Sequence, residues 1–326
     1  MAIFIRNTNY HTAAGLEEEL RGAAGGAAVQ AEVQTLGQSE EGRPIFGVCF
    51  GDGDYRKPEM LYYAGAHSME FIGVEAALDV VRKLADRNMP AALRNALERV
   101  NVWVIPVLNP DGYAAVEKML STGLGLAIGR KNANGVDLNR NFPVGFYQFP
   151  RSVFAGSPLK VSPHYRGGGP CSEAESQVFR DFILGRNIKL SLDFHSFGAC
   201  ILFPYHHTKK KCRDHETLLR LGQGIAGRQE RPYVVKPSWN LYFANGDIDD
   251  WMYDECNVLP LAMEIGKFGM DPRRLETLLN PFFWANPVDP RVELDNVVEP
   301  ALSLIHAMVE MFAVADASAE DSDTGE

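Results

Sequence analysis

Hydrophobic residues along the first half of the chain form short runs separated by stretches with helical spacing. Residues 9–24 carry a modest helical pattern, and residues 32–36 and 44–50 predict two short strands around the polar turn SEEGRP. The apolar runs MLYYAGA (60–66) and NVWVIPVL (101–108) predict buried strands, and the second run leads into a turn at residues 109–112. Between these runs, residues 73–87 place apolar side chains at helical spacing and predict a helix.

The second half of the chain continues the alternation. Helices are predicted at 173–185, near 213–227 and at about 295–314, and strands at 189–194, 201–205 and 259–265. Strands that alternate with helices are typical of the α/β class, with a mostly parallel or mixed sheet covered on both faces. We expect one domain over residues 1–314. Residues 315–326 contain five acidic groups and no large apolar side chain, which predicts a disordered acidic tail.

Composition and charge narrow the function classes. The chain has 326 residues, 46% of them hydrophobic, and a formal net charge of −10, which argues against a general binder of nucleic acids or of anionic membranes. No run of residues is long and apolar enough to predict a transmembrane helix. The five cysteines form no disulfide framework, and the first residues do not resemble an export signal, so we expect reduced thiols and a cytoplasmic location.

Polar residues stand at the ends of several predicted strands. His67 and Glu70 follow the run at 60–66, His195 ends the strand at 189–194, and Glu264 interrupts the apolar strand at 259–265. In α/β sheets, ligand sites lie beyond the carboxyl ends of strands. A histidine and a carboxylate three residues apart can bind zinc, but a surface histidine and a helix-capping glutamate are an alternative. A buried Glu264 requires a metal or a charged partner, and a purely structural arginine partner is the alternative.

The segment GRKNANGVDLNRNF (129–142) supplies cations and amides. Arg130 and Arg140 can each bind an oxygen anion, and Asn139 adds a donor. Asp137 can accept a hydrogen bond from the distal nitrogen of a ligand histidine and so fix its tautomer. Each arginine taken alone is equally consistent with a surface position.

Several motifs together resemble one known family. The motifs are, in order, AGAHSMEFIG, IPVLNPDGY, RKNANGVDLNRNF, PCSEAESQVF, DFHSFGACILFPY, LYFANGDIDDW and AMEIG. Their order and approximate spacing, over about residues 10–311, resemble those of the zinc carboxypeptidases of the carboxypeptidase A type (peptidase family M14). The resemblance implies a single-domain, eight-stranded mixed sheet with helices on both faces. It also implies hydrolysis of the C-terminal peptide bond of peptides that carry a free terminal carboxylate.

The resemblance assigns roles to the metal and catalytic residues. It implies that His67, Glu70 and His195 bind one catalytic zinc ion, with water in the fourth position. Glu264 then matches the general base, and Arg130 matches the residue that polarises the scissile carbonyl.

The resemblance also assigns substrate-binding residues. Asn139 and Arg140 match the pair that holds the terminal carboxylate, and Tyr242 matches the mobile tyrosine that closes over it. Alignment of the AxGxxxDW motif on residues 244–251 puts Asp249 at the floor of the pocket for the terminal side chain, where members that prefer Lys or Arg also carry aspartate. The alternative is that Asp249 or Asp250 only caps a helix.

Two other functions remain open from the sequence. The first is a cytoplasmic murein-peptide amidase that cleaves before diaminopimelate, from a neighbouring branch of the family. The second is a catalytically inactive homologue that only binds peptides. Tyr242 and the complete pair of Asn139 and Arg140 favour the carboxypeptidase over the amidase, and the intact metal ligands and Glu264 argue against an inactive homologue.

Overall fold

An eight-stranded mixed sheet forms the centre of the structure, a computed structural model that describes residues 8–121, 129–150, 152 and 154–313. The strand order is β1-β2-β4-β3-β5-β8-β6-β7. The strands are β1 (Ala31–Gln38), β2 (Pro44–Phe50), β3 (Glu59–Ala64), β4 (Asn101–Ile105), β5 (Ile188–His195), β6 (Cys200–Phe203), β7 (Val234–Pro237) and β8 (Leu259–Glu264). The four central strands, β4, β3, β5 and β8, are parallel to one another, whereas β2 and β6 run antiparallel to them. The predicted fold class is confirmed.

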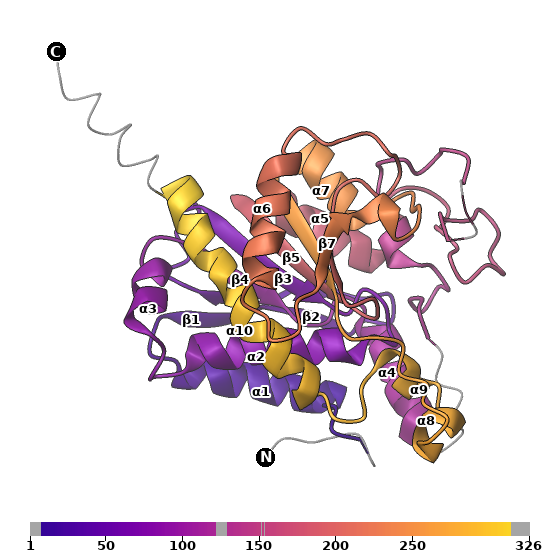
Figure 1. Cartoon of the computed structure of the whole chain (residues 1–326), viewed down its shortest axis with the longest axis horizontal. Helices are drawn as coiled ribbons and strands as arrows, with labels where there is room; N and C mark the ends of the chain where they lie inside the picture. The colour runs from indigo at the N-terminus through magenta and orange to yellow at the C-terminus, as the bar shows by residue number, and fades with distance from the viewer. Residues whose placement is uncertain (1–7, 122–128, 151, 153, 314–326) are drawn as a thin grey trace.

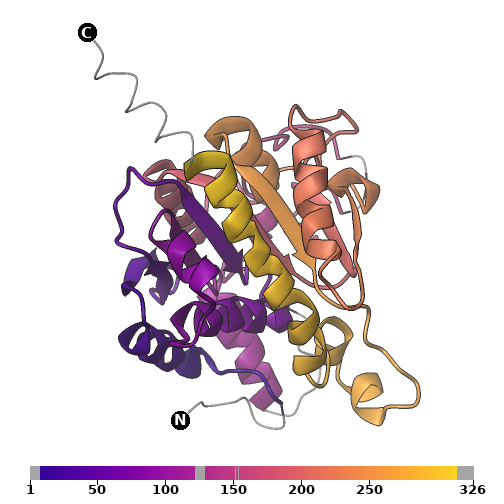
Figure 2. The ribbon, with the colours of Figure 1, turned by 60° about the vertical axis from the view of Figure 1, so that its left-hand side comes forward.

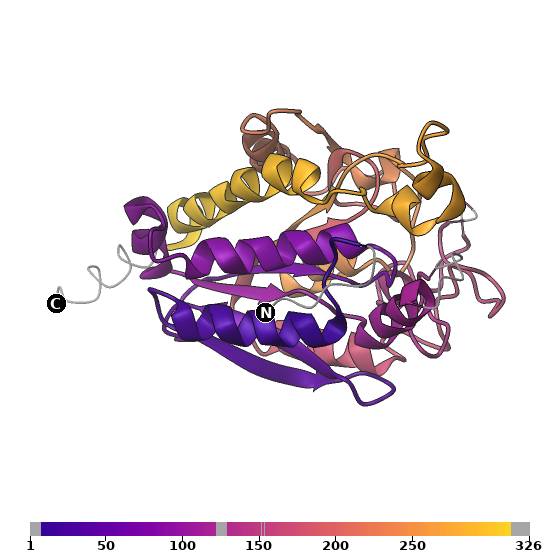
Figure 3. The same ribbon diagram turned by 90° about the horizontal axis from the view of Figure 1, so that it is seen from below.

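Helices cover both faces of the sheet (Figure 1). One face is covered mainly by α1 (Ala13–Gly26), α2 (Phe71–Ala85), α6 (His215–Ala226) and α10 (Arg291–Met308). Helix α10 packs against both α2 and α6 (Figure 2), and α1 lies beside α2 (Figure 3). The opposite face is covered by α5 (Ala174–Leu184) and α7 (Ile248–Cys256). The other α-helices of the described residues are α3 (Ala91–Leu97), α4 (Pro110–Ser121), α8 (Leu275–Leu279) and α9 (Phe282–Ala285). None of the helices in the described ranges is long and apolar enough to span a bilayer.

The alternation of side chains along β5 separates the core from the polar face that matters for function. Leu190, Leu192 and Phe194 belong to the larger hydrophobic core, under α2, α6 and α10. Successive strand residues point to opposite faces, so Asp193 and His195 point to the face that α5 and α7 cover. Both side chains are buried.

One local prediction is wrong. The segment expected to be a turn at residues 109–112 is the first turn of α4, which begins at Pro110. Proline suits the first helical position because its fixed φ fits the helix and its missing N–H has no helical partner there. Asn109 accepts a hydrogen bond from the backbone N–H of Gly112 at 2.9 Å, as a residue that caps a helix does.

Several elements were not predicted. Helices α3, α8 and α9 and the edge strand β7 are short, and their hydrophobic periodicity is correspondingly weak. The predicted disordered tail at 315–326 lies outside the described residues.

Candidate active site

The polar residues at the carboxyl ends of β3, β5 and β8 meet at one edge of the sheet. After β3 the chain turns at Gly65, which has a φ of 70° and a backbone that approaches Val107. The turn then continues to Glu70, whose N–H donates to the carbonyl of His67 at 3.2 Å. His195 ends β5. Thus two segments more than a hundred residues apart bring a histidine, a glutamate and a second histidine together.

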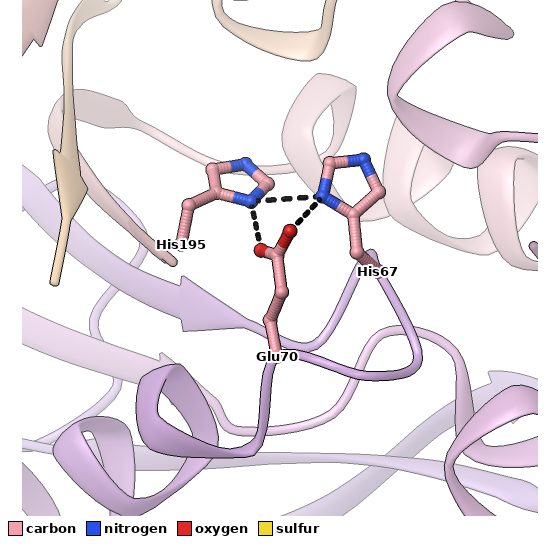
Figure 4. A group of neighbouring side chains, drawn as sticks. All are labelled: His67, Glu70 and His195. Carbon is pink, nitrogen blue, oxygen red and sulfur yellow. Dashed lines mark hydrogen bonds and ion pairs between the residues drawn. The ribbon is translucent and has the colours of Figure 1, made fainter. Parts of the chain in front are cut away.

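The three side chains point toward a common centre (Figure 4). Nδ1 of His67 lies 3.0 Å from Oε1 of Glu70, Nδ1 of His195 lies 2.7 Å from Oε2, and the two Nδ1 atoms are 3.1 Å apart. Burial raises the pKa of Glu70, but the two facing imidazoles outweigh it and bring the pKa below its ordinary value. Glu70 stands at the start of α2 but makes no side-chain capping hydrogen bond. Two imidazole nitrogens and one carboxylate in a buried cluster are a donor set that suits zinc.

The outer nitrogen of each histidine faces a carboxylate. Nε2 of His67 lies 3.2 Å from Oδ1 of Asp137, and Nε2 of His195 lies 2.7 Å from Oδ2 of Asp193. Contacts of this kind orient a histidine ring, and the inner Nδ1 atoms here face each other and Glu70. Asp137 is the residue that the sequence indicates for this position, whereas Asp193 was missed. A usable signal was present, because residues i and i+2 of a strand share a face and Asp193 precedes His195 by two positions.

Arg130 adjoins the triad through Asp137. Its Nε donates to Oδ2 of Asp137 at 2.6 Å, and its Nη1 lies 3.9 Å from Oε1 of Glu70. Burial lowers the pKa of Arg130, but Asp137 outweighs this effect, so the guanidinium stays charged. Its Nη2 is buried and has no hydrogen-bond partner among the described residues. Nδ1 of His164, another residue that the sequence did not single out, lies 3.3 Å from Oδ2 of Asp137.

Glu264 ends β8 directly beside His195, its register partner on β5. Its side chain is buried, and no ion pair joins it to an arginine among the described residues, although Arg130 is near enough to lower its pKa. Burial raises the pKa of Glu264. The nearby His195 opposes this rise and the nearby Glu70 adds to it. The result is a buried carboxyl group next to the triad with an increased affinity for protons.

Asn139 and Arg140 lie in a short 3-10 turn, Leu138–Arg140. Oδ1 of Asn139 accepts the backbone N–H of Ile248 at 2.9 Å, which orients its Nδ2 the other way. Nε of Arg140 donates to the carbonyl of Phe154 at 2.9 Å, while its buried Nη2 has no hydrogen-bond partner among the described residues. The ring of Tyr242 covers the guanidinium, with 5.6 Å between the ring centroid and the guanidinium carbon. A buried, partly unpaired guanidinium is costly unless an anion binds to it.

Asp249 lies in the first turn of α7 but does not cap it. The capping residue is Asp247, whose Oδ1 accepts from the N–H groups of Asp249 at 3.1 Å and Asp250 at 3.2 Å. Oδ1 of Asp249 accepts instead from the hydroxyl of Tyr63 at 2.9 Å. Burial raises the pKa of Asp249 well above its ordinary value, and the nearby carboxylates of Asp247 and Asp193 raise it further.

Comparison with known proteins decides the family. The family model described as zinc carboxypeptidase matches residues 17–280. The chain belongs to the zinc carboxypeptidase family. The resemblance seen in the sequence is therefore confirmed.

Individual members of the zinc carboxypeptidase family show the extent of the likeness. Carboxypeptidase A4 of Mus musculus is 31% identical over 234 residues, which are 67% of this chain and 53% of that protein. Carboxypeptidase B of Astacus astacus is 29% identical over 264 residues, which are 77% of this chain and 84% of that protein. The crystal structure of the carboxypeptidase A from Helicoverpa armigera superposes with a TM-score of 0.72 at 24% identity, covering 95% of this chain and 75% of that one. The chain thus spans about half the length of the mouse relative.

The donor set agrees with the metal in the family's name. His67, Glu70 and His195 are buried, and one nitrogen or oxygen atom from each lies within 4.8 Å of those of the other two. With the outer nitrogens held by Asp137 and Asp193, the residues present fit a zinc ion.

Proposed function

We propose that this chain is a zinc-dependent metallocarboxypeptidase that removes single residues from the C-terminus of peptides. The observation that carries the proposal is that Arg130 and Arg140, in the same site as a cluster of metal-binding side chains, each have a buried Nη2 without a hydrogen-bond partner among the described residues. A metal centre supports hydrolysis, and a buried guanidinium without a full set of partners supports recognition of a carboxylate.

In this proposal His67, Glu70 and His195 hold the zinc ion. When bound, zinc supplies the Lewis acidity that lets water act as a nucleophile near neutral pH. Glu264 accepts the proton that the attacking water loses and passes it to the leaving amine, a role suited to its raised pKa. The free Nη2 of Arg130 donates to the oxygen of the scissile carbonyl as negative charge develops there, an interaction that contributes about 3 kcal/mol in comparable sites.

Recognition of the chain end rests on Asn139, Arg140 and Tyr242. Nη2 of Arg140 and Nδ2 of Asn139 donate to the terminal carboxylate of the substrate, since Ile248 already fixes the other end of the amide of Asn139. Tyr242 packs over Arg140 and limits access of water to that ion pair. The enzyme therefore acts at chain ends, because a peptide that placed an internal residue in the site would leave the guanidinium of Arg140 without a carboxylate partner.

We infer a preference for Lys or Arg at the C-terminus, with Asp249 as the selecting residue. The support is that Asp249 is buried and does not cap α7, and that burial and then the carboxylates of Asp247 and Asp193 raise its pKa, so that a nearby cation would favour its ionised form. A cationic side chain that enters beside Asp249 relieves this repulsion, whereas an acidic one adds to it.

We also infer a cytoplasmic location. All five cysteines are free thiols, and four of them are buried, which supports a reducing compartment.

The test uses the zinc-loaded protein and matched peptides that end in Lys, Arg, Phe or Glu, together with a murein tripeptide, with products identified by mass spectrometry. We expect release of one terminal Lys or Arg, lost in Glu264→Gln and retained in Glu230→Gln, a matched change at an exposed position. Preferential release of Phe would contradict the role of Asp249 and keep the enzyme class. Cleavage of the murein peptide alone would favour the amidase, and no cleavage with zinc bound would favour a binding protein.

A further inference from the structure

The shortest polar contact of His195 outside the triad is made with Asp193. Oδ2 of Asp193 lies 2.7 Å from Nε2 of His195, and the side chains are 1% and 6% exposed. Both residues belong to β5, which lies between β3 and β8 in the middle of the sheet. The backbone on either side is thus held by ladder hydrogen bonds, so the Cα positions of Asp193 and His195 are fixed relative to each other.

Asn139 also approaches Nε2 of His195 but cannot accept a hydrogen bond from it. Its Nδ2 lies 3.4 Å from that nitrogen. Its Oδ1 already accepts the N–H of Ile248 at 2.9 Å, which fixes the amide with Nδ2 toward the imidazole. When Nδ1 of His195 binds a metal, Nε2 carries the proton, so two donors face each other at this contact. Among the described residues, the carboxylate of Asp193, 2.7 Å away, is the anionic group that faces this nitrogen.

We propose that Asp193 is a positioning residue for the metal ligand His195, equivalent in action to Asp137 for His67. This inference rests on the proposed zinc site. Asp193 keeps the proton of the imidazole on Nε2 and thereby directs the Nδ1 lone pair toward Glu70 and His67. The metal centre is then supported by a carboxylate behind each of its histidines.

The charge of Asp193 has a second consequence for metal affinity. A carboxylate that accepts a hydrogen bond from one imidazole nitrogen increases the basicity of the other nitrogen, which then binds a metal more strongly. Loss of an outer carboxylate of this kind typically weakens metal binding by about 10- to 100-fold. We therefore expect Asp193→Asn, which keeps an acceptor oxygen but loses the charge, to weaken zinc binding less than Asp193→Ala.

Zinc affinity measured by competition with a chromophoric chelator tests the proposal without any peptide. The matched control is Ser191→Ala, two residues earlier on the same face of β5, which removes a buried hydroxyl that has no hydrogen-bond partner among the described residues. We expect a roughly 10- to 100-fold weaker zinc affinity for the Asp193 variants and for Asp137→Asn, and no change for Ser191→Ala. In the metal-free state, the thermal midpoints of the Asp193 variants should stay close to that of the wild type. Equal zinc affinity in the wild type and in Asp193→Ala would overturn the proposal, whether or not the variant also lowers the metal-free midpoint.

A second measurement needs no Asp193 variant. In the zinc-loaded wild type labelled with 15N-histidine, proton–nitrogen correlation spectra report which ring nitrogen carries the proton, and His195 is assigned by the signal lost in His195→Gln. We expect a protected proton on Nε2 of His195. A proton on Nδ1, or an Nε2 proton that exchanges freely with water, would overturn the proposal. If the wild type binds zinc with these properties but cleaves no peptide, the proposed function fails while the role of Asp193 stands.

Discussion

His195 and Glu264 are register partners at the adjoining ends of the parallel strands β5 and β8. This pairing sets a candidate metal ligand beside a candidate proton acceptor through backbone hydrogen bonds, without dependence on a flexible loop. Central strands of a buried sheet are among the most rigid parts of a protein. The relative position of His195 and Glu264 is therefore fixed by the sheet itself.

The first prediction concerns Glu264. Replacement of Glu264 by Gln keeps the shape of the side chain and removes the proton acceptor. We expect kcat to fall by a factor of about 10²–10⁴, with KM nearly unchanged, because general-base catalysis contributes in this range. Steady-state kinetics on a peptide ending in Lys checks this, and zinc content should equal that of the wild type. A variant that keeps more than a tenth of the wild-type kcat would exclude Glu264 as the base.

The second prediction concerns recognition of the chain end by Arg140. The wild type should cleave a peptide with a free terminal carboxylate much faster than the same peptide with a terminal amide. In Arg140→Met we expect kcat/KM for the free acid to fall roughly 10- to 100-fold, since a charge-assisted hydrogen bond is lost. The exposed Arg94→Gln serves as the control. If Arg140→Met discriminates acid from amide as well as the wild type does, the terminal carboxylate binds elsewhere.

The third prediction concerns Asp249. Replacement by Asn keeps an acceptor for the hydroxyl of Tyr63 and removes the acidic group. We expect the ratio of kcat/KM for peptides ending in Lys and in Phe to fall by at least about tenfold, the factor that corresponds to about 1.4 kcal/mol. The competition between the two peptides can be followed in one mixture by mass spectrometry. An unchanged ratio would show that Asp249 does not select the side chain.

The fourth prediction links His207 to stability and pH. Nδ1 of His207 lies 2.6 Å from Oδ2 of Asp250. Burial lowers the pKa of His207, but Asp250 outweighs this effect and the net pKa is raised above the ordinary value of 6.5. A raised pKa in the folded state means that the protonated form stabilises the fold.

This stabilisation is fully present below the unfolded-state pKa and is lost as pH rises through the folded-state pKa. The difference in free energy of unfolding between the wild type and His207→Gln should therefore be largest below about pH 6.5 and should shrink at higher pH. Urea unfolding at a series of pH values measures it. A difference that grows with increasing pH would contradict the assigned ion pair with Asp250.

The sequence predicts the central sheet well because its strands are continuous apolar runs bounded by polar residues. The runs at 60–66, 101–108 and 259–265 correspond to β3, β4 and β8. The start of α4 was missed because Asn109 and Pro110 are as frequent in turns as at helix starts. A helix start differs from a turn here only in the helical spacing of the residues after Pro110. That spacing is a weaker signal than the turn-forming residues at 109–112.

The candidate site was only partly accessible from the sequence. Spacing alone indicated His67 and Glu70, and the family resemblance added the roles of Arg130 and Tyr242. Asp193 was missed although it precedes His195 by two positions in a predicted strand, because that spacing places two side chains on one face without fixing the distance between them. The distance between Asp193 and His195 depends on the geometry of the strand. The orientation of Asn139, the other group near Nε2 of His195, becomes clear only in three dimensions.

A zinc titration of the metal-free protein, with peptide cleavage followed by mass spectrometry, tests the central claim most directly. Release of a single C-terminal residue should rise in proportion to added zinc and reach a plateau at one zinc ion per chain. His67→Ala and His195→Ala should show neither tight zinc binding nor release. Full zinc binding without release of a terminal residue, or release that persists without metal in these variants, would contradict the account.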